Sequence, residues 1–174
     1  ANVQAAFSEF LHRLPFYGLA VLCIDDAEVR SLAQQMPRHV LTYGFDADAE
    51  VRASEVSQSG RQSSFVLHLP DAPPQRVTLN LPGRHNVLNA LAAAAIGWQL
   101  GVEPAAIGRA LEKFQGIGRR FNLHGEKSFG AGTALLVDDY GHHPAELAAV
   151  FQAARAGWPE RRLVVAFQPH RYTR

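Results

Sequence analysis

Residues 137–144 read VDDYGHHP and continue directly from the apolar run at 134–137. The run predicts a buried strand, and Pro144 opens a helical pattern that continues to about residue 157. Two carboxylates, a phenol and two imidazoles therefore leave the carboxyl end of a strand. Ligands of doubly wound α/β folds bind outside such strand ends, so we expect this cluster to act on a ligand.

A second polar cluster follows the apolar pattern at 163–167, where residues 168–174 read QPHRYTR. With the helical pattern between them, the two apolar runs predict a βαβ unit with parallel strands and a right-handed crossover. Both polar clusters would then lie at the same edge of one sheet.

The composition is that of a globular protein. The chain has 174 residues, of which 47% are hydrophobic and 19% charged, enough for one ordinary domain or two small ones. A net charge of +1 gives no strong electrostatic case for nucleic acid or a membrane surface. Cys23 is the only cysteine, which excludes an internal disulfide and fits a reducing compartment.

The pattern upstream of residue 118 alternates between helices and strands. Helices are expected at 3–14, 28–35, 86–100 and 104–114, and strands at 19–24 and 39–43. Residues 46–81 predict an antiparallel group with strands near 51–56, 64–69 and 76–80. A glycine-rich link at 115–118 and a strand near 121–125 follow, and we expect a domain boundary near residue 118. The chain opens without Met inside a helical pattern, so we also expect a piece of a longer protein.

Residues 83–89 read GRHNVLN and begin a helix. Asn86 and Asn89 are three apart and share one face of it. An amide offers both a donor and an acceptor, as a purine edge or a carboxylate requires. The alternative is helix capping, since Asn is a favoured N-cap, but two such residues on one face favour a binding site.

The other candidates each have an ordinary alternative. Arg119 and Arg120 alternate faces on a strand, so at most one would clamp a phosphate and either could be a solvated surface residue. His142 and His143 could be ligands, acid–base groups or turn residues; no Cys or third His stands at zinc spacing. His170, Arg171 and Arg174 could bind an anionic substrate or form a basic loop. The phosphate-loop pattern GxxxxGK[ST] is absent from the sequence.

Taken together, segments 82–89, 118–121 and 137–144 resemble the Mur ligases, ATP-dependent enzymes that build the peptide stem of peptidoglycan. The resemblance runs from about residue 10 to residue 174. It is strongest to the branch that joins L-alanine to the carboxylate of UDP-N-acetylmuramate through an acyl phosphate. The branch that recycles a whole tripeptide differs in the loop at 168–174.

The resemblance implies a mixed α/β fold. Residues 1–117 would form the C-terminal half of a central ATP-binding domain, a mixed sheet with an antiparallel insertion. Residues 118–174 would form the first part of a Rossmann-like C-terminal domain. The UDP-binding domain, the phosphate loop and the Mg²⁺-binding Glu and His of the family would lie outside this chain, so we expect it to be inactive alone.

The resemblance also implies roles for individual residues. Asn86 and Asn89 would bind the adenine side of ATP, and Asp139 would hold the ribose. The catalytic group would comprise Arg120, Asp139, His142, His143 and His170. The nucleotide-binding group would comprise Asn86, Asn89, Arg120, Asp139 and Tyr140. Tyr140, His142, Arg171 and Arg174 would contact substrate, and no residue would be a dedicated metal ligand.

The implied partners are UDP-N-acetylmuramate, L-alanine and ATP with Mg²⁺, in the bacterial cytoplasm and without nucleic acid or membrane. Exposed sheet edges would favour self-association, and the short segment after residue 117 is marginal for an independent core. Two other classes remain as alternatives: a non-catalytic nucleotide-binding or assembly module, and a histidine-based metalloprotein.

Overall fold

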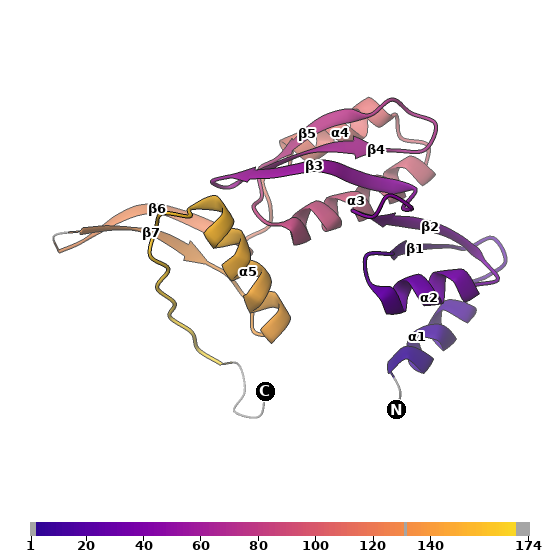
Figure 1. Ribbon diagram of the computed structural model, residues 1–174, viewed down its shortest axis with the longest axis horizontal. Helices are drawn as coiled ribbons and strands as arrows, with labels where there is room; N and C mark the ends of the chain where they lie inside the picture. The colour runs from indigo at the N-terminus through magenta and orange to yellow at the C-terminus, as the bar shows by residue number, and fades with distance from the viewer. Residues whose placement is uncertain (1–2, 131, 170–174) are drawn as a thin grey trace.

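The computed structural model describes residues 3–130 and 132–169, and they form the expected mixed α/β fold (Figure 1). A five-stranded sheet has the order β1-β2-β3-β4-β5, and a two-stranded sheet pairs β6 with β7. Helices α1 to α5 are distributed along the chain between and beside the strands.

The first part of the large sheet is parallel. After α1 (Val3–His12), β1 (Leu19–Cys23) pairs in parallel with β2 (His39–Gly44), and α2 (Ala27–Gln35) joins them. Asp26 is the N-cap of α2, and its carboxylate accepts hydrogen bonds from two backbone N–H groups of the first turn.

The second part of the sheet is antiparallel. Strand β3 (Val51–Ser59) pairs in parallel with β2 only at its start and then runs antiparallel to β4 (Gln62–His68), which pairs with β5 (Gln75–Leu79). Buried residues alternate with more exposed ones along β4, the period that follows from a half-buried strand. Because β3 pairs with β2 only at its start, the β3–β4 hairpin extends well beyond the parallel part of the sheet.

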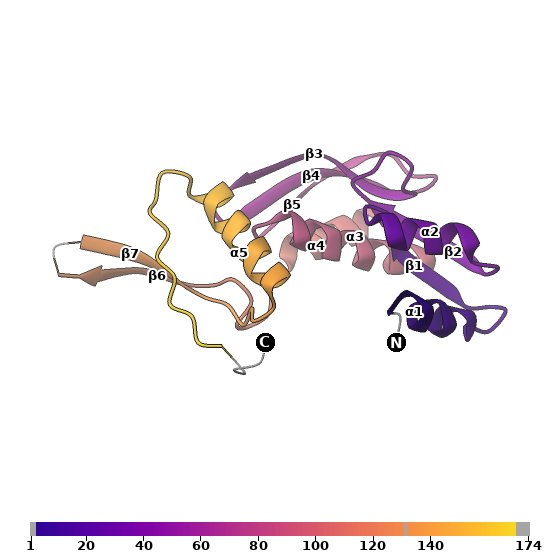
Figure 2. The ribbon, with the colours of Figure 1, turned by 60° about the horizontal axis from the view of Figure 1, so that its bottom comes forward.

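Helices α3 (Arg84–Gln99) and α4 (Pro104–Lys113) supply the helical side of the core. Helix α3 packs on β1 to β4, and α4 packs on β5; both lie beneath β3, β4 and β5 in Figure 2. The largest fully buried side chains include Leu41, Phe65 and Leu91. The alanines of α3 that face the sheet, Ala94 and Ala95, are almost completely buried, so the helix can approach the strands closely.

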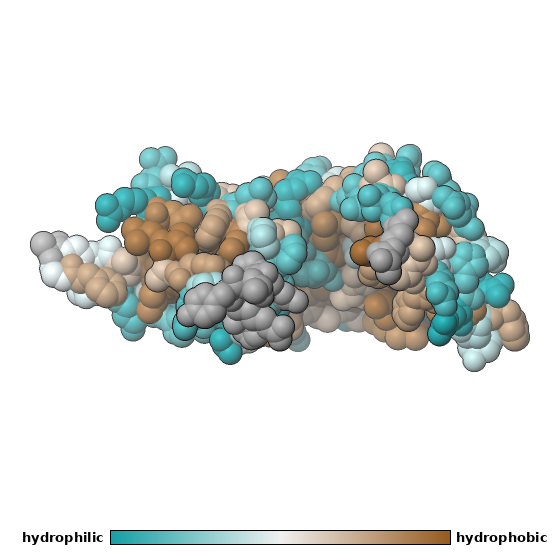
Figure 3. Space-filling view, turned by 90° about the horizontal axis from the view of Figure 1, so that it is seen from below, coloured by the Kyte–Doolittle hydropathy of each residue, from teal (hydrophilic) through white to brown (hydrophobic). Residues whose placement is uncertain are grey.

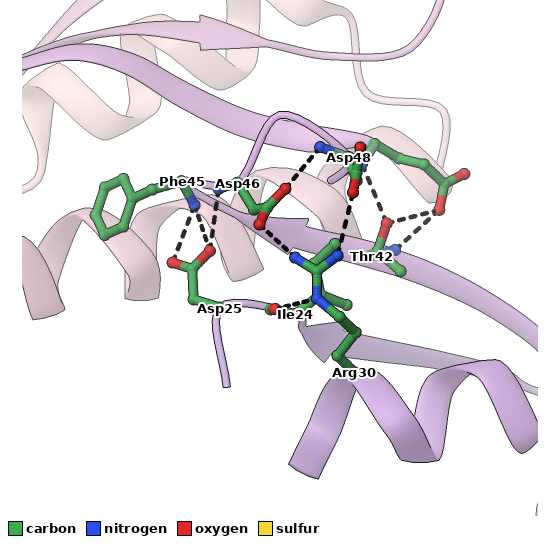
Figure 4. A network of polar contacts seen from close by, with 8 residues as sticks. Ile24, Asp25, Arg30, Thr42, Phe45, Asp46 and Asp48 are labelled. Carbon is green, nitrogen blue, oxygen red and sulfur yellow. Dashed lines mark hydrogen bonds and ion pairs between the residues drawn. The ribbon is translucent and has the colours of Figure 1, made fainter. Parts of the chain in front are cut away.

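A network of polar contacts joins the carboxyl ends of β1 and β2 (Figure 4). The carboxylate of Asp25 accepts hydrogen bonds from the backbone N–H groups of Phe45 and Asp46. The guanidinium of Arg30 donates to the Ile24 carbonyl and pairs with Asp46 and Asp48. The Asp48 backbone N–H, and then Arg30, hold the pKa of Asp46 below its ordinary value. The acidic residues of this loop are therefore held by backbone groups and one arginine.

After residue 118 the chain forms β6 (Asn122–Phe129), β7 (Gly132–Asp138) and α5 (Pro144–Gly157). The β6–β7 hairpin projects away from the large sheet, and α5 lies between the two in both ribbon views. Helix α5 packs against β3 and α3. In the described residues, no helix is both long enough and apolar enough to span a membrane.

The expected βαβ unit is wrong for the described residues. Residues 163–167 run as an extended segment that forms no strand, and β7 pairs antiparallel with β6. The physical reason lies in α5, which packs on β3 and α3 and so does not return the chain alongside β7. Val164 and Phe167 are 73% and 50% exposed. Figure 3 shows apolar surface at this end of the molecule, around α5 and the segment after it.

Candidate functional site

A cavity of about 860 Å³ lies between the start of α3, the end of α4, the link that follows α4, and the first half of α5. Its wall combines apolar side chains with a few polar ones. The polar and charged side chains in the wall are His85, Asn86, Asn89, Arg120, Asp139 and Glu146. A mostly apolar concave site with a few convergent polar groups is typical of small-molecule binding.

The first wall is the beginning of α3. Gly83 is the N-cap, with φ of 95°, a conformation that glycine adopts without strain. Asn86 and Asn89 follow on one face and both line the cavity. The Asn86 side-chain Nδ2 donates to the Pro82 carbonyl at 2.8 Å. Asn86 therefore supports the helix start from inside the first turn, while Gly83 occupies the N-cap position that the capping alternative assigned to an asparagine.

His85 also lines the cavity, and the sequence interpretation missed it although it stands inside the GRHNVLN segment. Its ring packs on Gly83, where an added Cβ would lie 2.6 Å from the ring carbon Cε1. Burial lowers the pKa of His85 below its ordinary value of 6.5; the charge of Asp139 opposes that shift and the charge of Arg120 adds to it. The lowered pKa favours the neutral imidazole, in which one nitrogen can donate and the other accept.

The second wall comes from the turn before β6 and the end of β7. The Asp139 carboxylate accepts hydrogen bonds from the backbone N–H of Phe121 at 2.8 Å and from that of Gly141 at 2.6 Å. Arg119 and Phe121 both have positive φ, 63° and 44°, which is uncommon for residues with a side chain. Asp139 thus holds a tight turn that presents Arg120 to the cavity.

Glu146 closes this wall from α5, and the sequence interpretation missed it as well. Its carboxylate accepts hydrogen bonds from the backbone N–H groups of His142 and His143 at 3.1 and 3.2 Å. It lies 3.7 Å from the Arg120 guanidinium. The His142 and His143 N–H groups, more than the nearby positive charges, hold the pKa of Glu146 below its ordinary value of 4.5. His143 and Glu146 form a capping box at the start of α5, but the usual sequence signal has Ser, Thr, Asp or Asn at the N-cap, so a histidine there gave no such signal.

The structure brings four of the sequence candidates together: Asn86, Asn89, Arg120 and Asp139 all line the cavity. Tyr140, His142 and His143 are outside its wall. Tyr140 lies edge-on to His142, with ring centroids 5.6 Å apart, and under the Arg119 guanidinium. His143 is the N-cap of α5, and its Nδ1 accepts from the Ala145 N–H. His170, Arg171 and Arg174 lie outside the described residues.

The donor set of this cavity fits a polar organic ligand better than a metal ion. Amide, guanidinium and imidazole groups dominate, and the Asp139 and Glu146 carboxylates are engaged by backbone N–H groups. Within residues 3–130 and 132–169, no group of three or more His, Cys, Asp or Glu side chains is arranged to hold a metal ion.

Comparison with known families assigns both parts of the chain. Residues 1–97 match the Mur ligase middle domain, and residues 119–173 match the Mur ligase glutamate ligase domain.

Individual relatives of the chain are also Mur ligases. A UDP-N-acetylmuramate–L-alanine ligase from Xanthomonas campestris pv. campestris is 66% identical over 175 residues, which cover 100% of this chain and 37% of the relative. The crystal structure of UDP-N-acetylmuramate-alanine ligase MurC from Thermotoga maritima superposes with a TM-score of 0.74 at 28% identity, covering 97% of this chain and 36% of that one. MurF ligase from Thermotoga maritima, solved in complex with ADP, shares the fold with a TM-score of 0.65 at 20% identity and covers 81% of this chain and 31% of its own. The chain thus spans about 37% of the length of the curated relatives it matches.

Proposed function

Since this chain belongs to the Mur ligase family, we propose that it is part of an ATP-dependent ligase that joins L-alanine to the carboxylate of UDP-N-acetylmuramate in peptidoglycan precursor synthesis. The relatives named for that reaction are 66% identical along the whole chain. The observation that carries the proposal is the meeting of Asn86, Asn89, Arg120 and Asp139 in one cavity. We also propose that residues 1–117 belong to the central ATP-binding domain and residues 118–174 to the C-terminal domain.

In this proposal the cavity holds the adenosine part of ATP. The amides of Asn86 and Asn89 present donors and acceptors to the adenine edge, and apolar wall residues such as Leu111 and Val150 contact the faces of the base. Asp139 keeps unused lone pairs beside its two backbone hydrogen bonds, and these can accept from ribose hydroxyl groups. Arg120 stands in the same wall, where its guanidinium can contact phosphate oxygens.

The reaction proposed for the whole protein transfers the γ-phosphate to the muramate carboxylate. The amine of L-alanine then attacks the acyl phosphate, and phosphate leaves from a tetrahedral intermediate. Such chemistry depends on positioning and on charges aimed at the transferring group. Tyr140, His142, His143, His170, Arg171 and Arg174 stay proposed contacts of the reacting groups and of the alanine carboxylate.

Mg²⁺ would neutralise phosphate charge in this reaction, but the described cavity does not have the donor set of a metal site. The proposed location is the bacterial cytoplasm.

Nucleotide binding tests the proposal. Isothermal titration of the folded chain with ATP and with ADP should show binding, and Asn89→Ala should weaken it by about three- to tenfold, the loss of roughly one hydrogen bond. Asn122→Ala is the matched control, because Asn122 lies on β6 outside the cavity wall. Equal affinities of the two variants, or no binding by the folded wild-type chain, would refute the assignment. In the whole protein, phosphate release from ATP should require L-alanine; release that depends on a tripeptide instead would indicate the recycling branch.

A further inference from the structure

One side chain outside the cavity bonds to the backbone of two of the helices that line it, α3 and α5. Gln58, near the end of β3, accepts a hydrogen bond at its Oε1 from the Gly83 backbone N–H at 2.9 Å. Its Nε2 donates to the Ala153 carbonyl at 2.8 Å and to the Gly60 carbonyl at 3.2 Å. Gly83 is the N-cap of α3, and Ala153 lies in α5. A single amide therefore bridges α3 and α5 from a third element, the β3–β4 hairpin.

The groups that Gln58 bonds are removed from water. Gly83 is buried and Ala153 is 2% exposed. The N-cap N–H of a helix has no partner within the helix, and a buried N–H without a partner is costly. Gln58 supplies that partner at the start of α3 and uses its other end on α5. The acceptor end of the Gln58 amide therefore supports the start of α3, and its donor end supports α5.

The backbones meet closely around this amide. A Cβ added at Gly157 would lie 2.5 Å from the Gly60 carbonyl oxygen and 2.8 Å from Gln58 Nε2. A Cβ added at Gly83 would lie 2.9 Å from the Ala153 Cβ. All three distances are shorter than side-chain carbons tolerate, so glycine is required for the hairpin, α3 and α5 to approach this closely. We call this contact of Gln58, Gly60, Gly83, Ala153 and Gly157 the glycine joint.

The glycine joint and the cavity share α5. Ala145, Glu146, Ala149 and Val150 line the cavity, and Ala153 follows Val150 by about one turn on the same helix. Asn86 and Asn89, on the opposite wall, belong to the helix that Gly83 begins. A shift of α5 at the joint therefore moves one wall of the cavity relative to the other.

We infer that Gln58 is a positioning residue that fixes α5 against the start of α3 and thereby sets the distance between the two walls of the cavity. Gln58 itself is not among the residues of the wall, so it acts on a ligand only through these helices. The inference rests on the proposed nucleotide site for its functional part and on the observed bonds for its structural part.

Two substitutions separate the two ends of the amide. Gln58→Glu keeps an acceptor for the Gly83 N–H but replaces the donor to Ala153 with an oxygen. Gln58→Leu removes all three side-chain hydrogen bonds at similar volume. Gln62→Ala is the control, because the Gln62 side chain donates to the side chain of Asn80, which directly follows β5, and not to α3 or α5 in the described residues.

Hydrogen exchange of the wild-type and variant chains, followed by NMR, tests the structural part. Both Gln58 variants should lose protection of the α5 amides, while protection of the Gly83 N–H should be lost in Gln58→Leu and kept in Gln58→Glu. Protection of α5 in Gln58→Glu equal to that in Gln62→Ala would overturn the inference. Far-UV circular dichroism confirms that each variant is folded, and if Gln58→Leu fails to fold, Gln58→Glu alone decides the result.

Titration with ADP tests the functional part. Both Gln58 variants should bind ADP about three- to tenfold more weakly than Gln62→Ala does. A loss of that size corresponds to about one hydrogen bond. Loosened α5 amides with unchanged ADP affinity would overturn the positioning role. A wild-type chain that binds no adenine nucleotide would refute the proposed function instead, and the exchange experiment would still decide whether Gln58 holds α5.

Discussion

The ring of Phe121 stacks on the ring of Trp158, with planes 6° apart and centroids separated by 6.0 Å. Phe121 is 6% exposed and ends the turn that carries Arg120, while Trp158 is the C-cap of α5. The stack therefore fastens the Arg120 turn to the far end of the helix whose first half lines the cavity. Together with the Asp139 carboxylate, it fixes the second wall from two directions.

Removing this stack should cost stability. Phe121→Ala is expected to lower the free energy of unfolding by about 3 kcal/mol, the usual cost of deleting a buried aromatic ring. Urea denaturation of both proteins measures the difference. Phe129→Ala makes the same change on the β6–β7 hairpin, where the ring is 62% exposed, and should change stability by less than about 0.5 kcal/mol. Similar losses in the two variants would contradict the structural role of the stack.

Asp139 should prove to be a structural residue as well as a candidate ligand contact. Asp139→Asn turns one of two acceptors into a donor that faces a backbone N–H, so we expect the free energy of unfolding to fall by about 1–3 kcal/mol. The neighbouring Asp138→Asn, at an exposed strand end, is the matched control and should be nearly neutral. If the two variants have equal stability in urea, the carboxylate does not hold the turn.

The lowered pKa of Glu146 predicts a specific dependence of stability on pH. The folded-state pKa lies below the ordinary value of 4.5, so the carboxylate contributes stability above the unfolded pKa that is lost as pH falls through the folded pKa. Glu146→Gln should therefore flatten part of the fall in melting temperature between about pH 5 and about pH 3. Because the side chain is 38% exposed, solvent screening keeps the effect small. Parallel pH profiles of wild type and variant would refute this assignment.

His85 should titrate below 6.5, since burial lowers its pKa and Arg120 lowers it further. A depressed histidine contributes stability above its unfolded pKa that is lost on acidification through the folded pKa. NMR titration of the imidazole should show the lowered midpoint, and Arg120→Ala should raise it. Arg119→Ala serves as the control, because its guanidinium lies over Tyr140. An equal response to both arginine variants would mean that Arg120 does not face His85.

Gly157→Ala tests the glycine joint without changing Gln58. Alanine is the better helix former by about 1 kcal/mol, so a loss of stability would report the collision with the Gly60 carbonyl. Gly97→Ala in α3 is the control, since its added Cβ would make ordinary contact with Ile107 at 3.5 Å and should stabilise. Thermal melts that show both variants stabilised would mean that the hairpin and α5 are not in close contact.

The secondary structure before residue 160 could be predicted because it follows from local periodicity. Alternation along β4, the alanine-rich helical pattern of α3 and the proline that begins α5 are all readable without knowing what they touch. The strand expected at 163–167 was wrong because an apolar run indicates burial or pairing but does not name a partner. Helix α5 packs against β3 and α3 through contacts such as the Gln58–Ala153 hydrogen bond, which join residues far apart in the chain and leave no local pattern.

The residues of the site also divide into those that could be predicted from the sequence and those that could not. Asn86 and Asn89 could be grouped from their spacing on one helix, and Arg120 and Asp139 came from the resemblance to a family. His85, Glu146 and Gln58 were missed because their surroundings are assembled by the fold: Gln58 bonds a residue 95 positions away. The structure shows that Arg120 and Asp139 share a cavity with the two asparagines; their contacts with a nucleotide stay a prediction, as does self-association through sheet edges.

The division of the cavity wall between residues before and after Gly118 has a thermodynamic consequence. A ligand that contacts both walls acts as a reversible crosslink between two segments, in addition to the glycine-rich link and the contacts of α5 with β3 and α3 that already join them. By mass action, a ligand at one hundred times its dissociation constant would add about 2.7 kcal/mol to the stability of that arrangement. Occupancy of the site and the stability of the assembled walls are thus linked: a change that loosens the walls lowers the affinity for the ligand, and a change that lowers the affinity reduces the stability that the ligand adds.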